Sequence, residues 1–63
     1  MKPNADYKYW YEDSELNHLK EEDLGMQYWR TEMKLETAIT NGDLQKTNEM
    51  KDRLKNIEML INQ

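Results

Sequence analysis

The only histidine of this chain, His18, stands three residues after Glu15. On a helix, residues at i and i+3 point the same way, and di-iron helical bundles use this Glu-x-x-His spacing for metal ligands. Such a site needs a second Glu-x-x-His, which would have to come from another chain. The chain also has no cysteine, so it has neither disulfides nor thiolate ligands. We therefore expect no metal and no cofactor, with His18 as a solvated side chain among acids.

Two groups of carboxylates, Glu12–Asp13 and Glu21–Asp23, have the chemistry for acid–base work. A catalytic pair needs a cleft that separates the two pKa values, and 63 residues offer little cleft. The sequence has no phosphate-binding loop, no nucleophile elbow and no His-Glu-x-x-His motif. We interpret these carboxylates as a solvated acidic face and expect no enzyme.

The residues best suited to bind a partner are aromatic. Four of the six aromatic residues fall within five positions near the N-terminus: Tyr7, Tyr9, Trp10 and Tyr11. Tyr and Trp are enriched at binding hot spots because they combine large apolar area with a polar atom. The sequence leaves open whether this cluster fills a core or contacts a partner. Our sharper hypothesis is that Tyr9, Trp10 and Tyr11 contribute more to binding than to folding.

The charge pattern restricts the partner. The net charge of −4 lies entirely in residues 1–25, whereas residues 26–63 balance to zero. An acidic chain is a poor match for nucleic acid, since binding there depends on contacts to phosphates. It would instead be steered toward a basic patch on a host or cognate protein.

No apolar run approaches the roughly 20 residues that cross a bilayer, and the N-terminus lacks an apolar signal core. Together with the absence of cysteine, this predicts a cytoplasmic protein without membrane contact.

The predicted fold is all-α, one small domain over residues 1–63. Residues 1–12 are expected to be a flexible or extended arm, followed by a short helix over about 14–23 that Asp13 or Ser14 caps. Two longer helices are predicted over about 26–40 and 44–61. Gly42 favours a helix stop and Asp43 a new cap. The sequence does not decide whether the chain bends at Gly25 or continues as one helix.

The two longer helices predict an antiparallel hairpin. On the second, Met50, Leu54, Ile57 and Ile61 form a heptad seam. Arg53 is expected on the surface beside this seam, paired with Glu49 four residues earlier. The facing pairs have a constant register: Leu24–Ile61, Tyr28–Ile57, Thr31–Leu54, Leu35–Met50 and Ala38–Thr47.

The first hairpin helix carries a second apolar stripe, Met26, Trp29 and Met33, nearly opposite its core face. The sequence leaves open three ways in which this stripe could be covered. The segment Tyr7–Tyr11 could fold back over it, a second copy could bury it in a dimeric helical bundle, or a foreign protein could bind it.

The hairpin resembles the small aspartyl-phosphate phosphatases that act on sporulation response regulators, over Arg30-Thr-Glu-Met33, Gly42 and Leu44. Their signature S-Q-x-L-D-x-L-I aligns with residues 51–58, where Leu54 matches and Ile57 is conservative. Lys55 stands at the position of the family's functional Asp. The resemblance therefore implies shared hairpin geometry, and a phosphatase-like activity is the third hypothesis for function.

The leading hypothesis is a small protein-binding regulator or inhibitor, with Tyr7–Tyr11, Met26, Trp29 and Met33 as its partner-binding residues. The composition, rich in Lys, Asn, Glu and Ile, is similar to that of short reading frames of phages and mobile elements, which suggests a protein that blocks a host factor. The alternative is a self-assembling scaffold or assembly chaperone.

Overall fold

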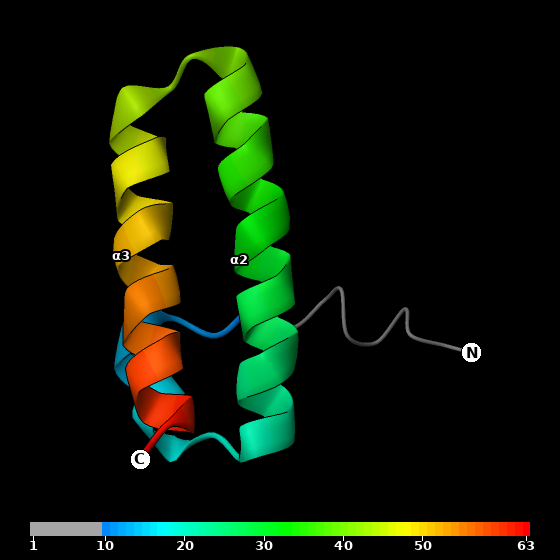
Figure 1. The fold of residues 1–63 in the computed structure, drawn as a ribbon, viewed down its shortest axis with the longest axis vertical. Coiled ribbons are helices and arrows are strands. Elements are labelled where there is room, and N and C mark those ends of the chain that lie inside the picture. Colours follow the sequence, from blue (N-terminus) through cyan, green and yellow to red (C-terminus); the bar gives the residue numbers. More distant parts are fainter. Residues whose placement is uncertain (1–9) are drawn as a thin grey trace, which may run out of the picture.

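The computed structural model describes residues 10–63, and three helical elements make up most of this part of the chain (Figure 1). A 3-10 helix, η1, spans Asp13–His18; α2 spans Glu21–Asn41 and α3 spans Leu44–Ile61. The described residues contain no strand. The predicted all-α fold and the hairpin of two long helices are confirmed.

The hairpin turn forms where the sequence predicted it. Gly42 follows α2 with φ 71°, a left-handed conformation that strains residues with a Cβ. The amide of Asp43 donates to the carbonyl of Ala38 at 2.9 Å, which satisfies one carbonyl of the last turn. The Asp43 carboxylate accepts from the amide of Lys46 at 3.1 Å and caps α3.

The start of α2 differs from the prediction. The helix begins at Glu21, not near residue 26, and continues through Gly25 without a break. Three acids, Glu21, Glu22 and Asp23, occupy its first turn, where negative charge is stabilised by the helix dipole. Glycine disfavours a helix by about 1 kcal/mol, which this favourable start and the packing of the hairpin outweigh.

The short helix also differs from the prediction of 14–23. It is a 3-10 helix of six residues, and Glu12, not Asp13 or Ser14, is its N-cap residue. The amide of Glu12 donates to the Glu15 carboxylate at 2.9 Å. Asp13 is therefore available for a long-range contact, described below.

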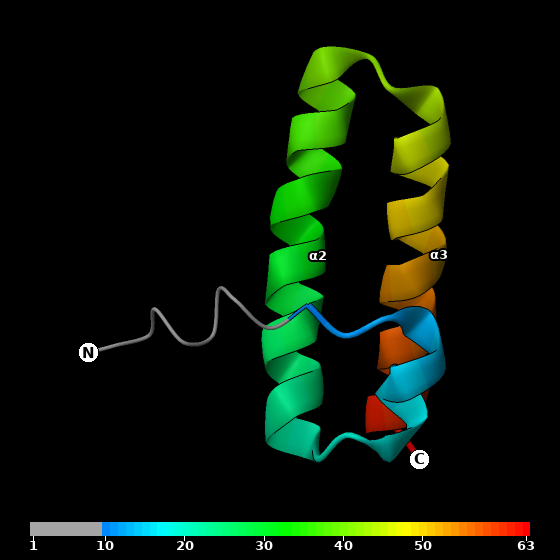
Figure 2. The same ribbon diagram turned by 180° about the vertical axis from the view of Figure 1, so that it is seen from behind.

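The core lies where η1 packs against the open end of the hairpin. Leu16, Leu24 and Ile57, one from each element, are buried against one another. Tyr11, Leu19, Tyr28, Leu60 and Ile61 surround them. Figure 2 shows η1 lying along α3, with residues 10–12 crossing the hairpin before it. The short element thus closes one side of a two-helix hairpin.

The register of the hairpin agrees with the prediction to within one residue. Tyr28 contacts Glu58 and Thr31 contacts Arg53, next to the predicted pairs Tyr28–Ile57 and Thr31–Leu54. The predicted seam of α3 was wrong at one position, because Arg53 is buried and Leu54 is only half-buried. The heptad interpretation assumed two helices, whereas Trp10 and η1 cover the side of α3 that carries Arg53.

Within the described residues, none of the three helices is long and apolar enough to span a membrane.

Candidate functional site

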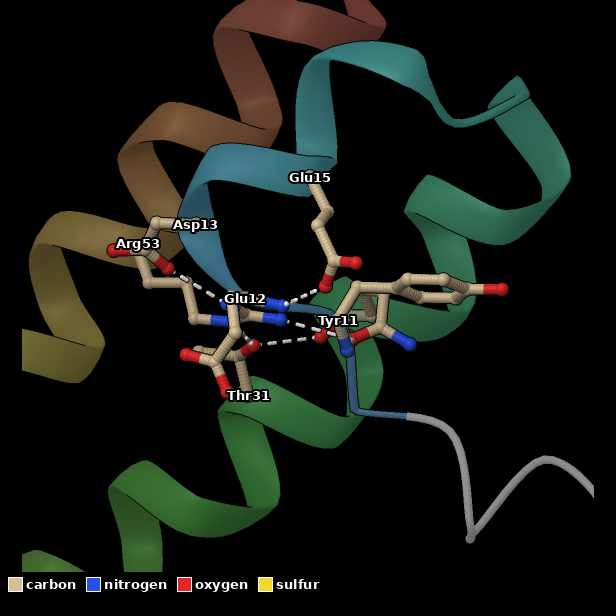
Figure 3. Close-up of polar contacts among 7 residues, drawn as sticks. Tyr11, Glu12, Asp13, Glu15, Thr31 and Arg53 are labelled. Atoms are coloured by element: carbon tan, nitrogen blue, oxygen red, sulfur yellow. Dashed lines mark hydrogen bonds and ion pairs between the residues drawn. The ribbon is translucent and has the colours of Figure 1, made fainter.

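Among the described residues, the one buried charged side chain is Arg53, which is only 2% exposed. Its guanidinium reaches the groups of two other elements (Figure 3). Nε donates to Thr31 Oγ1 at 2.9 Å and Nη2 donates to Gln27 Oε1 at 2.8 Å, both on α2. Nη1 donates to Asp13 Oδ1 at 2.7 Å, on η1. A planar guanidinium can serve three acceptors at once, as the smaller lysine ammonium cannot in this arrangement.

The acceptors are themselves held in place. Gln27 Oε1 also accepts the backbone amide of Tyr11 at 3.2 Å, and the Thr31 hydroxyl donates to the Gln27 carbonyl at 2.7 Å. Buried polar groups stabilise a fold when they are satisfied and destabilise it when they lose a partner. This polar core (Gln27, Thr31 and Arg53) therefore ties α2, α3 and the arm together.

Trp10 covers the outer side of the polar core. Its ring lies 3.9 Å from the Arg53 guanidinium carbon, measured to the ring centroid. Lys34 Nζ and the Arg30 guanidinium carbon lie 5.1 and 6.0 Å from the same ring. The negative face of an indole attracts cations, most strongly where water is excluded. Trp10 is therefore surrounded by three cations of the protein itself.

A groove of about 650 Å³ opens beside Trp10. Its charged lining comprises three acids, Glu12, Asp13 and Glu49, and three cations, Lys34, Lys46 and Arg53. This balance gives no preference for an anion or a cation. Because the Arg53 guanidinium already serves three acceptors, we interpret the groove as the solvent boundary of a structural cluster.

The predicted partner-binding residues fall into two places. Trp10 covers Arg53, and Tyr11 packs around the Leu16–Leu24–Ile57 core. Both contacts support folding, whereas the sequence hypothesis gave these residues mainly to binding. Tyr7 and Tyr9 lie outside the described residues.

The other three predicted residues lie together on α2 and are exposed. Met26, Trp29 and Met33 are 37%, 44% and 51% exposed. We call them the Met–Trp face. A shallow groove of about 250 Å³ runs along it, lined by Trp29, Met33 and the flanking Arg30 and Lys34. Ile39, Leu44 and Met59 are also exposed, but they do not continue the helical spacing of this face.

His18 and Glu15 do not form the beginning of a metal site. Glu15 accepts the amide of Glu12, and His18 ends η1. Over residues 10–63, no group of three or more His, Asp or Glu side chains is placed to hold a metal ion.

Among residues 10–63, one titratable group has a clearly shifted pKa. The Tyr28 hydroxyl donates to Glu58 Oε2 at 3.4 Å. The negative charge of Glu58 raises the pKa of the Tyr28 phenol above its ordinary value of 10.0, and desolvation and the charge of Glu32 act in the same direction. The neutral phenol is therefore favoured, which suits a structural hydrogen bond between the two helices.

Sequence reasoning missed the polar core. A signal was present: Thr31 occupies a seam position and Gln27 precedes it by one turn, so α2 offers a polar stripe to α3. Arg53 continues the spacing of Met50 and Ile57 as well as Leu54 does. Hydrophobic pattern matching favours leucine at such a position and overlooks an arginine that polar partners can satisfy.

No protein-family model, no curated protein and no solved structure matches this chain.

Proposed function

We propose that this protein is a small protein-binding regulator that docks on its target through the Met–Trp face. One observation carries the proposal: α2 buries polar Gln27 and Thr31 toward its own hairpin and exposes Met26, Trp29 and Met33. Burying an apolar side chain of this size stabilises a fold by about 1.5–3 kcal/mol. Because these side chains are partly exposed in the fold, part of this stabilisation is not realised there, and binding of a partner that buries them would add it.

The chemistry of the face suits protein recognition. Tryptophan and methionine are enriched at interface cores, and methionine adapts its shape to irregular partners. The face projects from a continuous helix anchored by the hairpin, so little conformational entropy is lost on binding. The composition described above supports the narrower proposal that the chain comes from a phage or mobile element and inhibits a host protein.

The test is affinity capture from a lysate of the source cells, with matched variants. We expect the wild-type chain and Met59→Ala to retain the same captured protein, because Met59 is exposed on α3, away from the Met–Trp face. Trp29→Ala should lose it, and the purified protein should reproduce the difference by titration calorimetry. Equal capture by Trp29→Ala and the wild type would refute the proposal.

A further inference from the structure

The groove beside Trp10 has a basic wall and an acidic wall. The charged residues that the hairpin contributes are three cations and one acid: Lys34, Lys46, Arg53 and Glu49. The chain at the start of η1 contributes two acids, Glu12 and Asp13. The charges of the groove are therefore balanced only while this N-terminal segment lies on it, because the hairpin side alone has a surplus of two positive charges. We call Lys34, Lys46 and Arg53 the basic wall.

The segment Trp10–Asp13 contacts the basic wall in the way that a peptide ligand would. Its first residue places an indole ring 3.9 Å from the Arg53 guanidinium carbon, measured to the ring centroid. Its last residue places a carboxylate oxygen 2.7 Å from Nη1 of the same guanidinium, a contact that Figure 3 shows. Arginine is suited to meet both groups, because its guanidinium stacks on aromatic faces and its N–H groups pair with carboxylates. The wall thus holds an aromatic residue followed three positions later by an acid.

The segment Trp10–Asp13 is held less firmly than the rest of η1. Asp13 keeps 69% of its side chain exposed and Trp10 is only half-buried, whereas Leu16 is fully buried. A screened ion pair contributes little, and a short segment opens at a lower free energy than the whole fold. Tyr11 adds a backbone amide bond of 3.2 Å to α2, so the open form is a minor one. The segment can therefore leave the wall while Leu16 stays packed.

The basic wall continues beyond the part that Trp10–Asp13 covers. A second groove of about 220 Å³ leads toward the hairpin turn and shares Lys34 and Lys46 with the first groove. Its other lining residues also belong to the hairpin: Thr37, Ala38, Asn41 and Asp43. Figure 2 shows residues 10–12 crossing the hairpin and η1 lying toward its open end, so that neither covers the half nearer the turn. A longer acidic segment would make contacts there that Trp10–Asp13 does not make.

We infer that the basic wall is a second binding surface of this protein, for an acidic segment of another protein that carries an aromatic residue. The chain's own residues 10–13 occupy the wall until such a segment displaces them. Because only the open form binds, the affinity for the partner is reduced by the fraction of molecules that are open, and residues 10–13 act as an autoinhibitory contact. This inference goes beyond the proposed function and does not depend on the Met–Trp face.

A peptide is favoured over a nucleic acid, which is also anionic. The segment that the wall holds in this structure is a peptide with a carboxylate on Arg53. Glu49 lines the first groove and Asp43 lines the second, and both would repel an unbroken row of phosphates. A peptide can instead space its acids to meet the cations of the wall.

The probe is a pair of fluorescently labelled synthetic peptides, each about ten residues long, or roughly 33 Å when extended. The acidic peptide contains Trp-Tyr-Glu-Asp followed by alternating Glu and Ser, and the basic peptide has Lys in place of every acid. We expect the full-length protein to bind the acidic peptide and not the basic one in fluorescence anisotropy. In isotope-labelled protein, the Trp10 indole resonance should shift on binding while the Leu16 amide resonance stays in place.

Two matched pairs of variants separate the wall from its displacement. Lys46→Gln should weaken binding of the acidic peptide several-fold, whereas Lys51→Gln should not, because Lys51 is exposed on the same helix and lines neither groove. Asp13→Asn should strengthen binding several-fold, because it loosens the segment that competes for the wall. Asp52→Asn removes the same charge from an exposed position outside both grooves and should leave the affinity unchanged. Melting temperatures confirm that all four variants are folded.

Several results would overturn the inference. Failure of the acidic peptide to bind Asp13→Asn would refute the binding surface, and equal effects within either pair of variants would assign the binding to net charge. A Trp10 indole resonance that does not move in the bound complex would refute displacement.

Two further results would assign the wall to another occupant and also overturn the inference. Tighter binding of a single-stranded oligonucleotide than of the acidic peptide would assign it to nucleic acid. A dimer that Asp13→Asn dissociates would assign it to the N-terminal segment of a second copy. Trp29→Ala should leave the affinity for the acidic peptide unchanged, so this test and the test of the proposed function can fail separately.

Discussion

At the scale of single residues, Arg53 joins three elements of the fold through its guanidinium. It is buried at the junction of α2, α3 and η1, with an acceptor for three of its nitrogens. Of these acceptors, Asp13 keeps 69% of its side chain exposed. Water screens that ion pair, so the buried bonds to Gln27 and Thr31 matter more for stability than the formal salt bridge does.

Arg53→Lys should therefore cost more than Asp13→Asn. Lysine cannot reach all three acceptors, so the buried Thr31 hydroxyl loses its arginine donor or Gln27 Oε1 keeps only the Tyr11 amide, at a cost of about 2–3 kcal/mol in the free energy of unfolding. Asp13→Asn removes only a screened charge and should cost about 1 kcal/mol or less. Urea unfolding of both variants measures the difference. Equal losses would mean that the exposed ion pair, and not the buried network, carries the contribution.

The raised pKa of Tyr28 predicts that the folded protein loses stability at alkaline pH. Because its pKa is raised in the folded state by Glu58, the folded protein holds the phenolic proton more tightly than the unfolded chain does. This contribution is complete below about pH 10 and declines as the pH rises through the raised pKa. Stability should thus fall less steeply above pH 10 in Tyr28→Phe than in the wild type, as measured by urea unfolding across that range. Parallel pH profiles would contradict the assignment, since the other tyrosines are common to both proteins.

At the scale of secondary structure, α2 has a mixed inner face and an apolar stripe on its outer side. The face that meets α3 buries two polar side chains, Gln27 and Thr31, together with Leu24 and Ala38, and the opposite side exposes a tryptophan and two methionines. A helix selected for stability alone would have the larger apolar residues inside. The two glycines of the chain also differ: Gly42, just after α2, adopts the left-handed conformation of the turn, whereas Gly25, inside α2, has an ordinary helical backbone.

The two glycines should respond oppositely to alanine. Gly42→Ala places a Cβ at φ 71° and should lower the free energy of unfolding by about 1–2 kcal/mol. Gly25→Ala should raise it by about 1 kcal/mol, since the position is helical and, apart from the helix's own nearby backbone, the Cβ has no described atom within 4 Å. Thermal unfolding followed by circular dichroism resolves both changes. Destabilisation by Gly25→Ala would show that this glycine has a role within the monomer.

At the scale of the whole molecule, the protein is a hairpin completed by a third segment. Two helices alone bury too little surface to be stable at this size. Trp10, Tyr11 and η1 add the missing cover, with Leu16 fully buried and Trp10 placed over Arg53. Trp10 and Tyr11 therefore pack within the described fold, and among residues 10–63 the exposed aromatic residue is Trp29.

The two tryptophans provide a matched test of this division. Trp10→Ala should lower the free energy of unfolding by about 2 kcal/mol or more, because a partly desolvated cation–π contact with Arg53 is lost. Trp29→Ala should cost less than Trp10→Ala, because 44% of Trp29 is exposed and alanine favours the helix. Urea unfolding monitored by circular dichroism compares them. A larger loss for Trp29→Ala would place the Met–Trp face within the core of the protein.

Much of the architecture could be predicted from the sequence because it depends on local chemistry. Gly42 and Asp43 specify the turn and the cap through their own backbone and side-chain preferences. The spacing of Met50 and Ile57 sets the register of α3 against α2 to within one residue. The second stripe of Met26, Trp29 and Met33 was also evident from helical spacing alone.

Only the tertiary structure decided which polar residues are buried and which apolar residues are exposed. Arg53 is buried because Asp13, from 40 residues earlier in the chain, meets it together with Gln27 and Thr31. Such a site forms only when three segments converge, so no local pattern reveals it. Trp10 and Trp29 are the same residue type within one chain, yet one covers a buried cation and the other faces outward. Their roles differ because residues 10–12 cross the side of the hairpin where Arg53 is buried (Figure 2), whereas Trp29 lies on another side of α2.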